Sequence, residues 1–170
     1  MSVILYHGTN IEFEILDPSF SRGQLDFGSG SYLTLSQEQA RGMAKRKFKI
    51  FGGVEIVLEY EFIEDCLNRN DVKVFDGYTT EWTEFVILNR FFPDYQNPFN
   101  LVIGPVADGS IPDDIDAYME EFGNSWRLPE NLKMLTQKLV FGNEPNYIQY
   151  CFRDSDLIEK ALKLKCKYYE

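Results

Sequence analysis

The chain has 170 residues, of which 44% are hydrophobic and 15% aromatic, enough for a domain whose core needs neither a metal nor a disulfide. Its net charge of -10 argues against non-specific nucleic-acid binding, because cationic surface supplies most of the affinity for phosphate backbones. No apolar run is long enough for a membrane span or a signal peptide. The three cysteines form no disulfide framework, which fits a reducing compartment. We therefore expect a cytoplasmic protein without membrane contact.

The first part of the chain is predicted to form a strand, a loop and a helix. Residues 2–6 have the composition of a buried strand, which delivers His7-Gly8-Thr9 at its end. Residues 10–24 alternate unevenly and contain turn formers, which indicates a loop across the surface. Ser36, with Gln39 three residues later, is a plausible capping box for a helix from about 37 to 48 that carries a dense basic cluster.

The rest of the chain is predicted to mix strands and helices. Strands are expected at Val54–Phe62, Lys73–Phe75, Leu101–Val106, Asn146–Phe152 and Lys165–Tyr169. Helices are expected at Glu81–Phe91 after a Thr80 cap, at Ile111–Glu121, at Leu128–Leu139, and from a Ser155 cap to about Lys163. No internal repeat or linker divides the chain, so we expect one α+β domain spanning residues 1–170.

A glycine turn stands out within residues 25–34, where Gly28 and Gly30 let the backbone bend sharply just before Tyr32. Such a turn alone often only closes a hairpin. No Gly-x-Ser-x-Gly elbow and no Gly-Lys-Ser/Thr phosphate loop accompanies it, which argues against a catalytic serine and a P-loop. A glycine turn that presents an aromatic ring beside a His-Gly pair suggests a pocket for a flat ring bearing an amide.

His7 is the single histidine, and with cysteines that share no metal-ligand spacing it leaves no basis for a metal site. A histidine at a strand end is more often a structural hydrogen-bonder than a catalyst. Here it precedes Gly8, whose exposed backbone N–H and C=O can hold a carboxamide through one donor and one acceptor.

Tyr6-His7-Gly8-Thr9 and the later Phe27-Gly28-Ser29-Gly30-Ser31-Tyr32 together resemble the ADP-ribosyltransferase superfamily, in its diphtheria toxin and poly(ADP-ribose) polymerase branch. The chain is similar, over nearly its whole length, to an uncharacterised bacterial family within that superfamily. That resemblance includes Asp26–Thr34, Phe85–Arg90, Gly104–Asp108, Gln149–Phe152 and Ala161-Leu162. The resemblance implies a split, two-sheet α+β core with flanking helices, and NAD in the cleft between the sheets.

The resemblance implies catalytic roles for His7, Tyr32 and Gln149, the last at a position that is usually Glu. Gly8 would hold the nicotinamide carboxamide, Tyr32 would stack on the ring, and His7 and Gln149 would hydrogen-bond ribose hydroxyls. The NAD-binding residues implied in this way are His7, Gly8, Thr9, Asp26, Gly28, Gly30, Tyr32, Met43 and Gln149.

Two positions depart from the family pattern. Gln149 is neutral, so it can orient the ribose but cannot act as a general base or supply negative charge. Met43 stands where many relatives place an aromatic ring over nicotinamide.

Asp26 either accepts hydrogen bonds within the turn, which we favour, or contacts the dinucleotide. For Arg90 we favour a salt-bridged or helix-docking role, and we regard Arg22 and Arg41 as candidate pyrophosphate contacts on charge alone.

The function expected from this resemblance is NAD-dependent mono-ADP-ribosylation of a macromolecular target, either protein or nucleic acid. Relatives of this kind are often toxins of toxin–antitoxin or phage-defence systems, so an antitoxin or regulatory protein is an expected partner. The alternative is a catalytically inactive module that binds NAD or ADP-ribose and acts through protein contacts. Gln149→Glu is expected to raise NAD hydrolysis.

Overall fold

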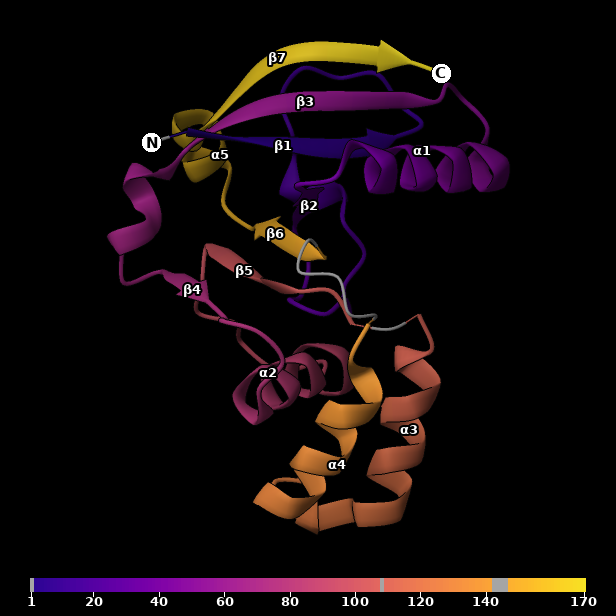
Figure 1. The fold of residues 1–170 in the computed structure, drawn as a ribbon, viewed down its shortest axis with the longest axis vertical. Coiled ribbons are helices and arrows are strands. Elements are labelled where there is room, and N and C mark those ends of the chain that lie inside the picture. Colours follow the sequence, from indigo (N-terminus) through magenta and orange to yellow (C-terminus); the bar gives the residue numbers. More distant parts are fainter. Residues whose placement is uncertain (1, 108, 142–146) are drawn as a thin grey trace.

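A computed structural model describes residues 2–107, 109–141 and 147–170, and within them the chain folds into one seven-stranded mixed sheet with five α-helices. This confirms the α+β prediction (Figure 1). The strands are β1 (Ser2–Thr9), β2 (Ser31–Thr34), β3 (Ile56–Ile63), β4 (Val72–Val74), β5 (Leu101–Pro105), β6 (Ile148–Phe152) and β7 (Leu162–Tyr169). The helices are α1 (Gln37–Phe51), α2 (Thr80–Phe91), α3 (Ile111–Phe122), α4 (Pro129–Leu139) and α5 (Ser155–Ala161).

The sheet order is β4-β5-β6-β2-β1-β3-β7, in which only the β4–β5 pair is parallel. The two halves of the sheet meet at β1 and β2, and this junction is narrow. Among the described residues, only Tyr6 and Thr34 pair across it, whereas β1 and β3 pair continuously from Ser2 with Ile63 to Thr9 with Ile56. The seven strands therefore form one sheet that is weakly joined near its centre.

Two hydrophobic cores lie on opposite faces of the sheet, because successive side chains of a strand alternate between faces. The first, which we call the α2 core, includes Phe27, Phe75, Trp82, Phe85, Val102, Leu135 and Cys151. The second, the α5 core, includes Leu5, Leu33, Leu58, Phe62, Phe152, Leu157 and Ile158. A small third cluster of Ala40, Ala44 and Val57 lies under α1. Figure 1 shows α1 beside β1, and α2, α3 and α4 together at the other end of the molecule.

Most of the predicted helices and strands are present, and the differences concern the residues at which some of them begin or end. The Ser36 cap is confirmed, since its hydroxyl accepts from the Gln39 N–H at 3.3 Å. The cap of α2 is Thr79 rather than Thr80, because the Thr79 hydroxyl accepts from Trp82 N.

At α5, Asp154 rather than Ser155 caps the helix by accepting from Leu157 N. That helix ends at Ala161, where β7 follows directly, instead of reaching Lys163. Strand β1 also runs further than expected, because it includes His7, Gly8 and Thr9. The predicted start of the late strand at Asn146 lies outside the described residues.

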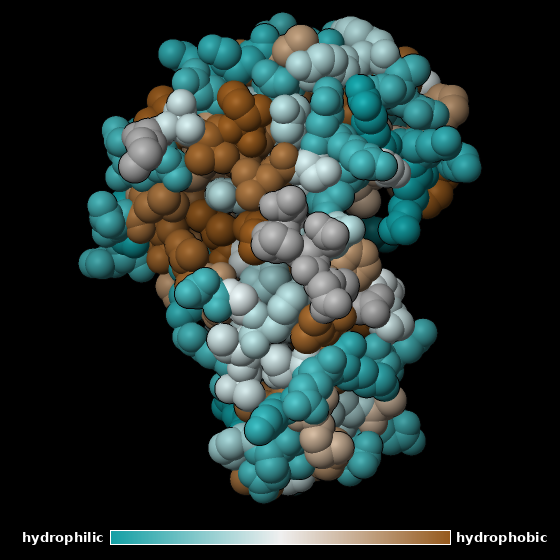
Figure 2. All heavy atoms as spheres, viewed as in Figure 1, coloured by the Kyte–Doolittle hydropathy of each residue, from teal (hydrophilic) through white to brown (hydrophobic). Residues whose placement is uncertain are grey.

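The hydropathy of the surface differs between regions of the molecule. Figure 2 shows hydrophilic residues over α1 and α3, and hydrophobic residues gathered over the region of α5, β5 and β6. None of the helices that the structure describes is long and apolar enough to cross a bilayer.

Candidate functional site

The hydroxyl of Tyr32 is part of the glycine turn. It donates to the Gly28 carbonyl at 2.6 Å and accepts from the Phe27 N–H at 3.0 Å. Gly28 has φ of 80°, a left-handed conformation that favours glycine. Burial raises the pKa of Tyr32 well above its usual value of 10, so the phenol remains protonated and can donate. The turn is therefore closed by the side chain of the strand that follows it.

Helix α2 and the loop that follows it hold the same turn from the other side. Asn97 donates from Nδ2 to the Phe27 carbonyl at 2.9 Å and to Asn89 Oδ1 at 3.0 Å. A Cβ on Gly28 would lie 2.8 Å from Asn89 Oδ1, so a larger residue would have to displace that side chain as well as adopt the left-handed conformation. The Phe85 ring packs 6.0 Å from the Phe27 ring. The segment Phe85–Arg90 thus acts as a support for the glycine turn.

His7 links the two halves of the sheet through its ring. Its Nδ1 lies 2.7 Å from the main-chain carbonyl of Tyr32. Burial, followed by the charge of Lys47, lowers the pKa of His7 from 6.5 to about 3, although the carbonyl opposes this. The ring is therefore neutral at physiological pH, with the proton on Nδ1, and Nε2 remains as a hydrogen-bond acceptor.

Gly8 lies against α1 so closely that no side chain fits. A Cβ at this position would overlap the Ala40 carbonyl oxygen and lie 2.8 Å from the Ala44 nitrogen. The Gly8 carbonyl, which was expected to accept from a carboxamide, already accepts from Lys47 Nζ at 2.9 Å. Thr9 is buried next to it, and its hydroxyl accepts from the Ile11 N–H at 3.2 Å.

Positive charge accumulates beside the end of β1. Burial, and then the charge of Arg22, lowers the pKa of Lys47, which places Arg22 within electrostatic range of it. Neither cation forms a salt bridge with an acid among the residues that the structure describes. Arg41, by contrast, pairs with Glu170 at 2.7 Å on the surface. Met43 is on α1 with 46% of its surface exposed.

Gln149 belongs to a buried network with Asp26 and Arg90. Asp26 is 5% exposed, and Arg90 Nε donates to its Oδ1 at 2.6 Å, which confirms the expected salt-bridged role of Arg90. Gln149 Nε2 donates to Asp26 Oδ2 at 2.9 Å and to the Pro105 carbonyl at 3.4 Å. Gly104 and Pro105 are thus part of the surroundings of Gln149.

The sheet brings the three expected catalytic residues onto neighbouring strands, in the order β6-β2-β1. Gln149 is in register with Thr34, and Thr34 with Tyr6. The rings of His7 and Tyr32 lie on different faces. Tyr32 packs against the α2 core, whereas His7 contacts Phe13, which packs against the α5 core. The contact between them is therefore made through the Tyr32 main chain.

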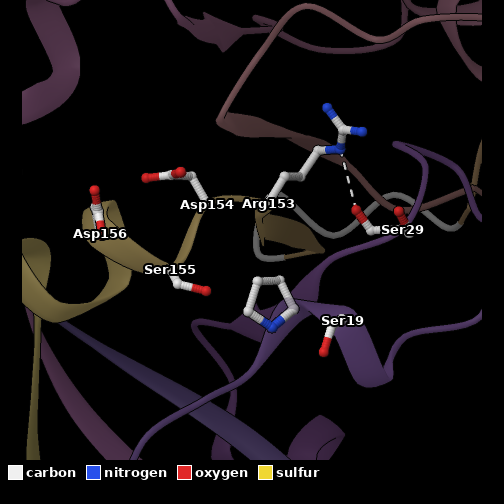
Figure 3. Close-up of a pocket in the computed structure, with 7 residues that line it drawn as sticks. Ser19, Ser29, Arg153, Asp154, Ser155 and Asp156 are labelled. Atoms are coloured by element: carbon white, nitrogen blue, oxygen red, sulfur yellow. Dashed lines mark hydrogen bonds between the residues drawn. The ribbon is translucent and has the colours of Figure 1, made fainter.

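Two of the hollows on the described surface are lined without His7, Tyr32 or Gln149. The larger has a volume of about 380 Å³ and lies beside the outer side of the glycine turn. Figure 3 shows it between Ser29, the Ser19 segment and the start of α5, with Arg153 reaching to the Ser29 carbonyl at 3.0 Å. Its lining is Pro18, Ser19, Ser29, Arg153, Asp154, Ser155 and Asp156.

Lys47 is a site residue that the motifs do not indicate, because it belongs to the dense basic cluster of the helix at 37–48. Helical spacing contained a signal, since positions 40, 44 and 47 share one face of α1 and the first two are buried alanines. The pairing of Asp26 with Gln149 joins residues 123 positions apart, and no local pattern indicates it.

A family model described as "Protein of unknown function (DUF3990)" matches residues 3–164 of the chain. Comparison with curated proteins gives no match, and neither does comparison with solved structures.

Proposed function

We propose that this protein, which belongs to the family described as "Protein of unknown function (DUF3990)", is an NAD-dependent mono-ADP-ribosyltransferase that modifies a macromolecule. The observation that carries this proposal is the adjacency of β6, β2 and β1. These strands bear Gln149, Tyr32 and His7, which are far apart in the sequence and match the order of the superfamily's motifs. In this proposal the narrow β1–β2 junction takes the place of the split between the two sheets, and NAD binds along it.

Residues at the junction and beside it carry groups that such a substrate would contact. The neutral His7 ring keeps Nε2 as an acceptor, because Nδ1 is held by the Tyr32 carbonyl. This ring lies on the α5-core side, so a ribose hydroxyl that binds Nε2 must lie across the junction from the Tyr32 ring. Arg22 and Lys47 carry positive charge without acidic partners among the described residues, so they attract the pyrophosphate. Departure of nicotinamide leaves a cation-like ribose, which the acceptor atom of the target attacks at C1′ while its proton passes to solvent.

Lys47 Nζ lies 2.9 Å from the Gly8 carbonyl oxygen, which the carboxamide N–H would also have to approach. An ammonium that hydrogen-bonds a carbonyl competes directly with the carboxamide N–H for the same acceptor. Binding of NAD therefore includes a shift of the Lys47 side chain, and the pyrophosphate is the negatively charged group that would receive it.

The proposal is tested by incubating the protein with NAD labelled in the adenosine half, together with cell lysate, and by measuring nicotinamide release. Wild type is expected to release nicotinamide and to label a macromolecule. His7→Ala and Gln149→Ala are expected to lower release by roughly tenfold or more, a loss of about 1.4 kcal/mol in transition-state binding. Lys133→Ala, at an exposed position on α4, is the matched control and should behave as wild type.

A second candidate function is an NAD-binding module without turnover, and the neutrality of Gln149 favours it. Calorimetry with NAD separates the two candidates. Binding together with nicotinamide release supports the transferase, and binding without release supports the module. Absence of binding at millimolar NAD counts against both.

A further inference from the structure

Asp26 connects the glycine turn to two distant segments of the chain. Its Oδ1 accepts from Arg90 on α2 at 2.6 Å, and its Oδ2 accepts from Gln149 on β6 at 2.9 Å. A buried carboxylate is costly unless a charged partner and hydrogen bonds compensate for lost hydration, and Arg90 and Gln149 provide both. The network is therefore complete as it stands.

The amide of Gln149 has one favourable orientation in this network. Its Nε2 donates both hydrogens, one to Asp26 Oδ2 and one to the Pro105 carbonyl. A flipped amide would turn Oε1 toward these two acceptors, which repel it, so Oε1 must face away from Asp26.

Gln149 is only 9% exposed, but its Oε1 atom is not fully enclosed. No described residue donates a hydrogen bond to it. The described part of the chain also contains no buried side-chain oxygen or nitrogen that lacks a partner. An unpartnered Oε1 is therefore not completely buried, and it has acceptor capacity left for a hydroxyl outside the network.

We propose that Asp26, anchored by Arg90, is a positioning residue that fixes the Gln149 amide with its carbonyl oxygen toward a hydroxyl of the bound dinucleotide. This inference rests on the proposed function, which supplies the ribose hydroxyl as the ligand group. Asp26 itself does not touch the ligand. The identity of residue 149 is thereby coupled to that of residue 26, because only a side chain with N–H groups can face Asp26 Oδ2 and the Pro105 carbonyl.

Glutamate at position 149 would conflict with this arrangement. It would place a second carboxylate against Asp26. The two carboxylates would then share one proton, because their negative charges repel each other at close range. The titratable and charged groups around the position are Asp26 in the turn, Arg90 on α2, Tyr32 on β2 and Cys151 on β6. The gain in NAD hydrolysis expected from Gln149→Glu therefore requires Asp26→Asn as well, because the introduced amide can donate to the new carboxylate.

Thermal unfolding at pH 8 and pH 5 tests the network without reference to NAD. Gln149→Glu is expected to lower Tm at pH 8 by roughly 5–10 °C and to recover much of this at pH 5, where the carboxylate pair takes up a proton. The double variant, Asp26→Asn with Gln149→Glu, is expected to be more stable than Gln149→Glu at pH 8. Gln137→Glu, the same change at an exposed position on α4, is the control. A Gln149→Glu Tm equal to wild type at both pH values overturns the proposal.

Calorimetric titration with NAD tests the positioning role. Asp26→Asn is expected to weaken NAD binding by about tenfold, the effect of one misaligned hydrogen bond, and the double variant to return within about threefold of wild type. Asp26→Asn that binds NAD as tightly as wild type overturns the positioning role and leaves the proposed function intact. Wild type that does not bind NAD, with the stability pattern preserved, overturns the proposed function and leaves only a structural network.

Discussion

Replacing Gly8 by alanine is expected to separate α1 from β1. The added Cβ would overlap the Ala40 carbonyl and lie 2.8 Å from the Ala44 nitrogen, where ordinary contacts begin at 3.4 Å. Both neighbours are helix backbone atoms, so no side-chain rotation relieves the contact and the helix itself must move. The buried cluster under α1 and the Lys47 contact to Gly8 are then disturbed together.

Overpacking of this kind costs about 1–3 kcal/mol, and a clash with backbone belongs at the upper end. A loss of about 3 kcal/mol lowers the Tm of a chain of this size by roughly 6–12 °C. Gly42→Ala is the matched control on α1, because an added Cβ there meets nothing within 4 Å beyond its chain neighbours and its own helix backbone. Alanine favours a helix interior over glycine by roughly 0.5–1 kcal/mol, so Gly42→Ala should raise Tm. If differential scanning calorimetry gives Gly8→Ala a Tm equal to wild type, the close approach of α1 to β1 is refuted.

Three further predictions concern the junction. Tyr32→Phe leaves the Gly28 carbonyl and a turn N–H without their partner, and it should lower the free energy of unfolding by about 1–3 kcal/mol in urea titrations; an unchanged midpoint counts against the role of the hydroxyl. His7 binds a proton near pH 6.5 when unfolded but only near pH 3 when folded, so acidification through this range favours unfolding by at most about 1.4 kcal/mol per pH unit. The free energy of unfolding of His7→Gln should therefore fall less steeply than that of wild type as the pH is lowered. Equal slopes for the two proteins would contradict the depressed pKa of His7. Lys47→Met frees the Gly8 carbonyl, so free nicotinamide, which has no phosphate, should bind about tenfold more tightly; equal or weaker binding argues against competition at that carbonyl.

Local patterns predicted the helices and most strands, because hydrophobic periodicity and capping residues can both be recognised within a few positions of the sequence. They could not rank adjacent candidate caps, as at Thr79 and Thr80, since both residues can accept from the first turn and tertiary packing decides. Apolar and polar residues alternate from Leu162 onward, which is the pattern of a strand. This pattern conflicts with a helix that extends to Lys163.

The candidate site was predictable as a set of motifs but not as a network. The glycine turn and the Arg90 ion pair follow from residue types, whereas the Asp26–Gln149 contact depends on the pairing of β6 with β2. Long-range strand pairing leaves no trace in a local window, so the neutral residue at position 149 could be noticed but not explained. The opposite faces of the His7 and Tyr32 rings likewise follow only from sheet register.

A crystal structure of the protein soaked with NAD would decide where the dinucleotide binds. We expect the nicotinamide ring beside Tyr32 with its carboxamide on the Gly8 backbone, Lys47 displaced toward the pyrophosphate, and Gln149 Oε1 at a ribose hydroxyl. NAD bound instead in the hollow between Ser29 and Arg153, or no bound NAD at millimolar concentration, would contradict a dinucleotide site at the β1–β2 junction.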